Sequence, residues 1–240
     1  RPLPFVLTAL TLSASALPEA AEFVPLGASS YRPGVVISGT GPALKGFEGS
    51  WLPAYPGAES PMAVPTGLSR TNVSSGAGAF LFDGPGGGRV GRRLRARFDD
   101  SIERTVYFSV LVQLQSAGSS YRAFELHNGG FDDNENRVLQ IATGEQGTGP
   151  FSASNFVIRV KDGGFVDSVD LGVGDATVNL FVGKLEFSAV PGGDRLAVWR
   201  NPDPLSEPGV GDAEFSGLNI RFDRVSMARF GEDGLTFDEI

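Results

Sequence analysis

Apolar and polar side chains alternate along most of the chain between Phe80 and Phe230, a pattern typical of β-strands that bury one face. The longest such segment is 105–115. Its even-numbered positions are all apolar, and Tyr107 and Leu111 add apolar side chains to the opposite face. A strand that is apolar on both faces is covered on both, so we expect this segment in the middle of a sandwich.

Further strands are predicted at intervals of about ten residues, which is the spacing of a two-sheet sandwich. They are 80–82, 93–98, 121–127, 137–142, 155–161, 177–188, 195–200 and one or two strands within 218–230. The turn sequences Asp162-Gly163-Gly164 and 191–194 accept positive φ angles and predict two hairpins. The pattern therefore predicts an all-β sandwich of two antiparallel sheets.

The composition favours the same class and excludes several functions. The 33 glycines and 16 prolines suit short strands and tight turns, and they disfavour long helices. A formal net charge of −8 argues against nucleic acid as a partner. The chain has no cysteine and one histidine, which excludes disulfides, thiolate metal sites and zinc sites built from several histidines.

The N-terminal residues 1–20 allow two interpretations. Arg1, the apolar run 5–12 and the small residues 14–16 are typical of a secretory signal peptide, and the run is too short to span a bilayer. Alternatively the segment is retained as an assembly strand that pairs with a neighbouring subunit's sheet. The side chains on one face of that strand are Val6, Thr8, Leu10 and Leu12. Both interpretations predict a secreted, extracellular or cell-surface protein.

Residues 21–45 are predicted to be a linker with a first strand at 35–37, followed by one domain over 46–240. Seven segments of this domain resemble, in order, a family of exported bacterial proteins with a concanavalin A/laminin G-like jelly roll and, often, a PEP-CTERM sorting tail. They are 46–51, 67–69, 105–109, 124–133, 182–187, 198–202 and 237–240. The resemblance implies export and a jelly-roll fold. The family pattern implies that the sequence stops at Ile240 inside the last strand, so a sorting tail is not visible in it.

An acidic loop between two predicted strands is a candidate Ca²⁺ site. It contains Asp132, Asp133, Asn134, Glu135 and Asn136, and hard cations prefer oxygen ligands of these kinds. The alternative is a solvated turn in which Asp and Asn side chains bind their own backbone. Calcium is the one cofactor that the sequence suggests.

Two groups of side chains are candidates for binding. Aromatic rings can stack on sugars, and the candidates for that contact are Trp51, Tyr55, Tyr121 and Trp199, with packing in the core as the alternative. Arg93, Arg95 and Arg97 share one face of a predicted strand. This basic face suits sulfated or uronic-acid glycans, or the acidic face of another copy, and its alternative is a solvated surface.

The sequence predicts no catalytic site. Laminarinase-type glycosidases of this fold use a Glu-x-Asp-x-x-Glu strand, and Glu125-Leu126-His127 departs from that pattern after its first residue. His127, the single histidine, is expected to make a structural hydrogen bond.

Three functional hypotheses follow from these observations. The main one is a non-catalytic extracellular structural protein that presents a β-sandwich surface and self-associates through its N-terminal strand. The alternative is a calcium-assisted, lectin-like module that binds extracellular polysaccharide. An enzyme acting on polysaccharide is the third.

Overall fold

The structure of the chain is a computed structural model. It describes residues 46–74, 77–101, 103–116, 118–131, 134–144, 154–163, 165–204 and 208–238, together with residues 32, 34, 36, 37 and 39. These residues form β-strands and one short 3₁₀ turn, Asn134–Asn136. None of these residues forms a helix long and apolar enough to cross a membrane.

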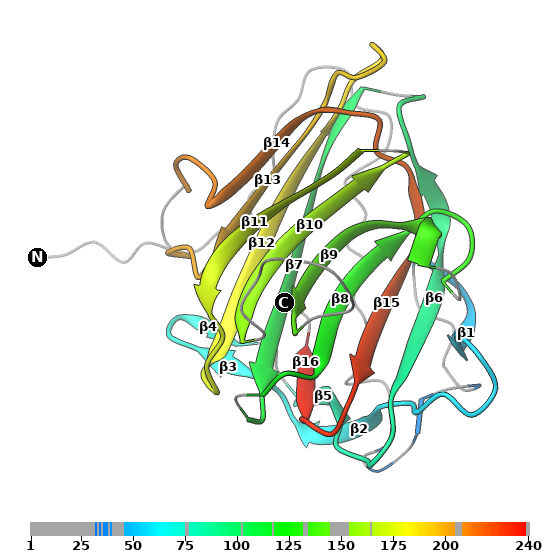
Figure 1. Ribbon diagram of the computed structural model, residues 1–240, viewed down its shortest axis with the longest axis vertical. Coiled ribbons are helices and arrows are strands. Elements are labelled where there is room, and N and C mark those ends of the chain that lie inside the picture. Colours follow the sequence, from blue (N-terminus) through cyan, green and yellow to red (C-terminus); the bar gives the residue numbers. More distant parts are fainter. Residues whose placement is uncertain are drawn as a thin grey trace, which may run out of the picture.

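Two antiparallel sheets of seven strands each make up the described part of the chain (Figure 1). The first sheet has the order β1 (Phe47–Pro53), β6 (Gly88–Phe98), β15 (Phe222–Phe230), β8 (Tyr121–His127), β9 (Arg137–Thr143), β10 (Asn155–Asp162) and β11 (Phe165–Val173). The second has the order β14 (Ala213–Leu218), β13 (Asp194–Arg200), β12 (Val178–Phe187), β7 (Arg104–Leu114), β16 (Leu235–Asp238), β5 (Ala77–Phe82) and β2 (Met62–Thr66). A small hairpin of β3 (Ser69–Arg70) and β4 (Val73–Ser74) lies beside them.

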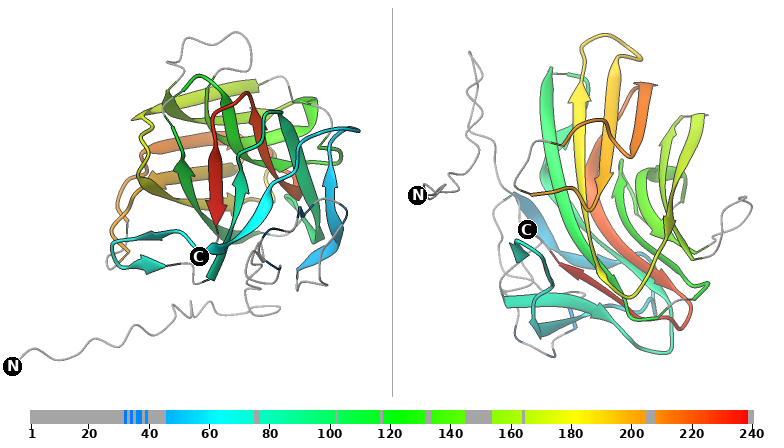
Figure 2. Two further views of the ribbon diagram at one scale, coloured as in Figure 1. Left: turned by 90° about the horizontal axis from the view of Figure 1, so that it is seen from below. Right: turned by 90° about the vertical axis from the view of Figure 1, so that its left-hand side faces the viewer.

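The two sheets are stacked face to face, as the two views of Figure 2 show. Apolar side chains from both sheets form the core between them. The largest fully buried side chains of this core are Trp51, Phe80, Phe82, Phe156, Phe181 and Phe237. Alternation along each strand sends these side chains inward. The predicted all-β sandwich of two antiparallel sheets is therefore confirmed.

The two predicted hairpins are also present. β10 pairs with β11 around Gly163, whose φ is +56°, and β12 pairs with β13. The predicted first strand at 35–37 is reduced, among its described residues, to an isolated bridge between Val36 and Met62.

The prediction that the central strand is covered on both faces holds for only part of β7. Leu111 is buried against Leu68 and Leu180, outside the main core. Tyr107 lies nearer the other end of the strand and is 52% exposed.

Candidate functional site

A bulge in edge strand β1 opens a pocket on the outer face of the first sheet. β1 pairs with β6 at Glu48↔Arg93 and next at Leu52↔Gly91, so residues 49–51 lie opposite a single residue of β6. Gly49 has a φ of +68°, which a glycine adopts without strain. The extra residues move this part of β1 away from β6.

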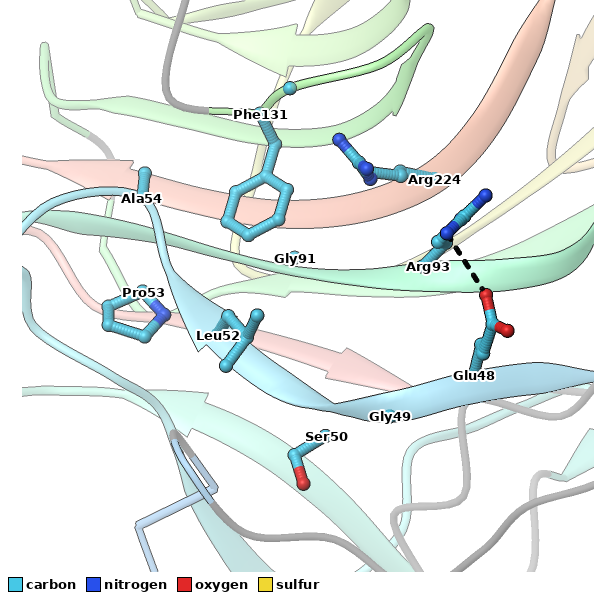
Figure 3. Close-up of a pocket in the computed structure, with 11 residues that line it drawn as sticks. Glu48, Gly49, Ser50, Leu52, Pro53, Ala54, Gly91, Arg93, Phe131 and Arg224 are labelled. Atoms are coloured by element: carbon cyan, nitrogen blue, oxygen red, sulfur yellow. Dashed lines mark ion pairs between the residues drawn. The ribbon is translucent and has the colours of Figure 1, made fainter.

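The pocket has a volume of about 510 Å³ and differs in character from one end to the other. Leu52, Pro53 and Phe131 lie toward one end, and the charged side chains of Glu48, Arg93 and Arg224 lie toward the other (Figure 3). Small-molecule sites are commonly of this size and combine apolar walls with a few polar groups. The pocket can therefore receive a ligand that is apolar on one side and charged on another.

Phe131 forms the apolar wall because it lies directly over a glycine. A Cβ atom at Gly91 would be 2.7 Å from Cγ of Phe131, so a larger residue there would displace the ring. The backbone carbonyl of Phe131 also accepts a hydrogen bond from Nη1 of Arg89 at 3.2 Å. The loop after β8 is thus attached to β6 both by packing and by a buried cation.

The charged end contains two arginines that face each other across neighbouring strands, Arg93 on β6 and Arg224 on β15. Nη1 of Arg93 lies 3.2 Å from a carboxylate oxygen of Glu48. Asp223 lies farther away, 3.8 Å from Nε of Arg93 and 4.0 Å from Nε of Arg224. One of its oxygens accepts a hydrogen bond from the backbone N–H of Gly129 at 2.9 Å.

A buried polar network lies on the same face of the sheet and centres on Glu125. Its carboxylate accepts hydrogen bonds from Nε of Arg89 at 2.7 Å, from the Tyr121 hydroxyl at 2.8 Å and from the Ser226 hydroxyl at 2.8 Å. Nε2 of His127 lies 2.9 Å from the Ser226 hydroxyl oxygen, so the predicted structural hydrogen bond of this histidine is present. All five side chains are buried. The network supports the pocket because Arg89 also holds Phe131.

The network keeps Glu125 ionised. Burial by itself raises the pKa of Glu125, but the hydrogen bond with His127 and the charge of Arg89 lower it by more, so the pKa lies well below its ordinary value. Burial and the neighbouring Glu125 carboxylate raise the pKa of Tyr121, which therefore keeps its proton.

We expect acid to weaken the fold through this carboxylate. A glutamate with a depressed folded-state pKa stabilises the protein above its unfolded pKa, here near 4.5, and this contribution is lost as the pH falls below that value. Urea unfolding between pH 7 and pH 3 (about four units around this transition) should therefore show falling stability. The loss should be smaller in Glu125→Gln, which cannot titrate. If the free energy of unfolding falls equally with pH in the wild type and in Glu125→Gln, Glu125 is not the group that makes the fold sensitive to acid.

The predicted sugar-stacking residues do not gather at the pocket. Trp51 and Tyr121 are buried, so their predicted role as exposed stacking platforms is wrong. Trp51 packs between Phe47 and Phe80, and Tyr121 donates its hydroxyl to Glu125. Tyr55 is exposed, and its hydroxyl donates to the carbonyl of Gly87. Trp199 is half-buried on the second sheet, where its indole N–H contacts the carbonyl of Gly209 at 3.0 Å.

The acidic loop is described only in part. Asp132 and Asp133 lie outside the described residues. Glu135 forms an ion pair with Lys161, and the carbonyl of Asn136 accepts a hydrogen bond from the backbone of Asn128 at 2.9 Å. The described residues contain no group of three acidic or histidine side chains that could hold a metal ion. A calcium site involving Asn134 and its neighbours stays a prediction.

The predicted assembly residues are likewise untested. Val6, Thr8, Leu10 and Leu12 lie outside the described residues. Arg93, Arg95 and Arg97 are all exposed, as expected for a basic face. Of these three, Arg93 alone lines the pocket, while Arg97 forms an ion pair with Asp99 at 3.5 Å.

Of the residues that line the pocket, only Arg93 was predicted from the sequence as a site residue, and Phe131 and Arg224 are among those that were missed. Phe131 follows Gly129-Gly130 directly after a strand, a position where a loop can fold back over its sheet. That signal was available. Nothing in the sequence indicates that Arg224 faces Arg93, because their strands are far apart in the chain.

Comparisons with known proteins identify the fold. No family model matches the chain, and no curated protein matches it. The globular domain of T. cruzi calreticulin shares 8% identity, with a TM-score of 0.53 over 79% of this chain and 82% of that domain.

Two further solved structures are less similar. The carbohydrate recognition domain of Emp47p has 12% identity and a TM-score of 0.40 over 74% of this chain and 87% of its own. Lectin UEA-II complexed with galactose has 10% identity and a TM-score of 0.44 over 86% of this chain and 99% of its own. The exported bacterial family with a sorting tail is not identified by these matches and stays a prediction. What is shown is the fold, a concanavalin A-like jelly roll of two antiparallel sheets.

Proposed function

We propose that this domain binds carbohydrate, and that the sugar occupies the pocket between β1, β6 and the loop after β8. The observation that supports this most directly is the Phe131 ring, which packs over Gly91 and borders an open, polar-ended pocket. An immobilised ring loses little conformational entropy when a ligand stacks on it.

The chemistry of the pocket suits a sugar because a pyranose ring has an apolar C–H face and a polar edge. Phe131, Leu52 and Pro53 provide apolar surface for the face, while Glu48 and the two arginines provide hydrogen-bonding groups for the edge. Leu52 is 52% exposed although it is large and apolar, and a bound sugar would cover it. One fold supports many functions, so the proposal depends on these residues and not on the fold alone.

The proposal includes a second, separately testable part, namely that Ca²⁺ assists sugar binding. Asp132 and Asp133 follow Phe131 directly in the chain. A cation held by these residues would restrain the loop that carries the ring. Binding measured with Ca²⁺ and with EDTA answers this question, and a loss of affinity in EDTA supports calcium assistance.

The test is a glycan array followed by calorimetry on the glycans that bind. We expect Phe131→Ala to weaken binding at least tenfold, which corresponds to about 1.4 kcal/mol. Tyr107→Ala is the matched control, since Tyr107 is also an exposed aromatic residue but lies on the second sheet. Failure to bind any glycan in the presence of Ca²⁺, or equal loss in both variants, would contradict the proposal.

A further inference from the structure

We propose that the bound saccharide carries an anionic group, a carboxylate or a sulfate, which Arg93 and Arg224 bind together at the charged end of the pocket. This inference rests on the proposed function and specifies its ligand class. Three features of the two arginines support it.

The first feature is the unfavourable position of the arginines relative to each other. Arg93 and Arg224 are directly opposed on adjacent antiparallel strands, where like charges destabilise a sheet. The carboxylate of Asp223 contacts both at 3.8 and 4.0 Å, which is beyond hydrogen-bonding distance. An anion between the two guanidinium groups would relieve this repulsion.

The second feature is the set of hydrogen-bond donors left at the pocket. Arg224 donates no hydrogen bond to another described residue, although its side chain is only 23% exposed, and Arg93 is paired at close range only with the exposed carboxylate of Glu48, 3.2 Å from its Nη1. Two buried arginines of the same sheet behave differently. Arg122 donates to the carbonyls of Ser116 and Gly118 at 2.8 and 3.0 Å, and Arg229 donates to Glu59 and to the carbonyl of Gly84. The N–H groups of Arg224, and those of Arg93 that do not face Glu48, thus remain available to a ligand.

The third feature is that the carboxylate of Glu48 already occupies part of this position. Glu48 is the cross-strand neighbour of Arg93, and their side chains are 57% and 56% exposed. An ion pair this exposed contributes little stability, so a ligand carboxylate or sulfate can displace it at small cost. Guanidinium groups bind planar and tetrahedral oxyanions through paired N–H donors, which adds orientation to the charge attraction.

The apolar end of the pocket selects a saccharide over other anions. Phe131 lies beside Arg224, whose Cζ is 6.0 Å from the ring centroid, so one ligand can stack on the ring and reach the cation at the same time. A sugar ring with an attached carboxylate or sulfate has this combination. Uronic-acid and sulfated polysaccharides share it, and the test separates them.

The experiment measures calorimetric affinity of the full chain for matched pairs of probes. One pair is an oligogalacturonide and its carboxyl-reduced, neutral form, and the other is a sulfated and an unsulfated galactan oligosaccharide. We expect at least one anionic probe to bind tenfold or more tightly than its neutral partner, and its affinity to fall as salt is raised. The pair that shows the difference identifies the anionic group.

Charge variants test the residues. Arg93→Gln and Arg224→Gln should each reduce affinity for the anionic probe about tenfold or more, since charge-assisted hydrogen bonds are lost. Arg195→Gln is the control, because Arg195 is exposed on the second sheet. Glu48→Gln should increase affinity for the anionic probe severalfold relative to affinity for the neutral probe, an effect that a purely structural role of Glu48 would not produce. Urea unfolding of each variant verifies that it is folded.

Three outcomes would overturn the inference. If charged and neutral probes bind with equal affinity, and only Phe131→Ala weakens binding, the ligand needs no anionic group but the proposed function still holds. Absence of binding to all four saccharides and to a glycan array removes both. If poly-glutamate binds as tightly as the anionic saccharide, and both arginine variants bind it more weakly, the arginines accept an acidic peptide. The claim that the ligand is a saccharide would then be wrong.

Discussion

Replacing Glu125 by alanine should lower the free energy of unfolding by about 3–5 kcal/mol, the usual result of removing one member of a buried ion pair. The substitution would leave the guanidinium of Arg89, 3% exposed, without its carboxylate. It would also remove the acceptor for the hydroxyls of Tyr121 and Ser226. Chemical denaturation at neutral pH measures the change.

Two variants make this prediction specific. Glu186→Ala removes a half-buried carboxylate that pairs with Lys184 on the second sheet, and it should change stability by no more than about 0.5 kcal/mol. Arg89→Met combined with Glu125→Leu should recover part of the loss, because apolar side chains of similar size need no partner. If the double variant is as unstable as the sum of the single ones, the two residues are not coupled.

Replacing Trp51 by alanine should cost a similar amount, about 3–5 kcal/mol, through the cavity that it leaves in the core. Trp51 is fully buried, and its ring centroid lies 6.2 Å from that of Phe47 and 5.8 Å from that of Phe80. Its backbone carbonyl accepts a hydrogen bond from the N–H of Gly39 at 2.7 Å. Because Trp51 anchors the bulge of β1, removal of its side chain should also disturb the pocket that the bulge opens.

The neighbouring residue provides the control for this prediction. Leu52→Ala changes an exposed side chain on the opposite face of the same strand, so we expect a loss below about 1 kcal/mol. Trp51→Phe should cost much less than Trp51→Ala, because the indole N–H has no hydrogen-bond partner among the described residues and an aromatic ring is kept. A Trp51→Ala effect no larger than that of Leu52→Ala would show that the tryptophan is not in the core.

The case of Trp51 illustrates what sequence reasoning could have found. Counting in twos from Phe47 places Trp51 on the same face of the strand, and both side chains belong to the core. The sequence analysis instead placed Trp51 among the candidates for sugar stacking, with packing in the core as the alternative. The burial of Tyr121 could not have been found this way, since it points to the outer face and is covered by Arg137 and Phe230 from other strands.

Single residues of the candidate site could be predicted from the sequence, but their combination into one site could not. Arg93 was identified as one of a basic face, and the segment containing Phe131 was noted for its resemblance to a family. Their combination with Arg224 depends on β6 and β15 being neighbours, and these strands are joined only through the long intervening chain. Periodicity describes each strand separately and contains no information about which strands pair.

The sequence by itself determined most of the strands between Phe80 and Phe230, the two hairpins and the class of the fold, because alternation and turn chemistry act over a few residues. It did not identify β1, β2, β14 or β16. The tertiary structure alone decided that a bulge separates β1 from β6, that Phe131 lies over Gly91, and that two arginines face each other. These features join residues distant in the chain. They arise from strand order and from the close packing of side chains between neighbouring segments, which no local pattern specifies.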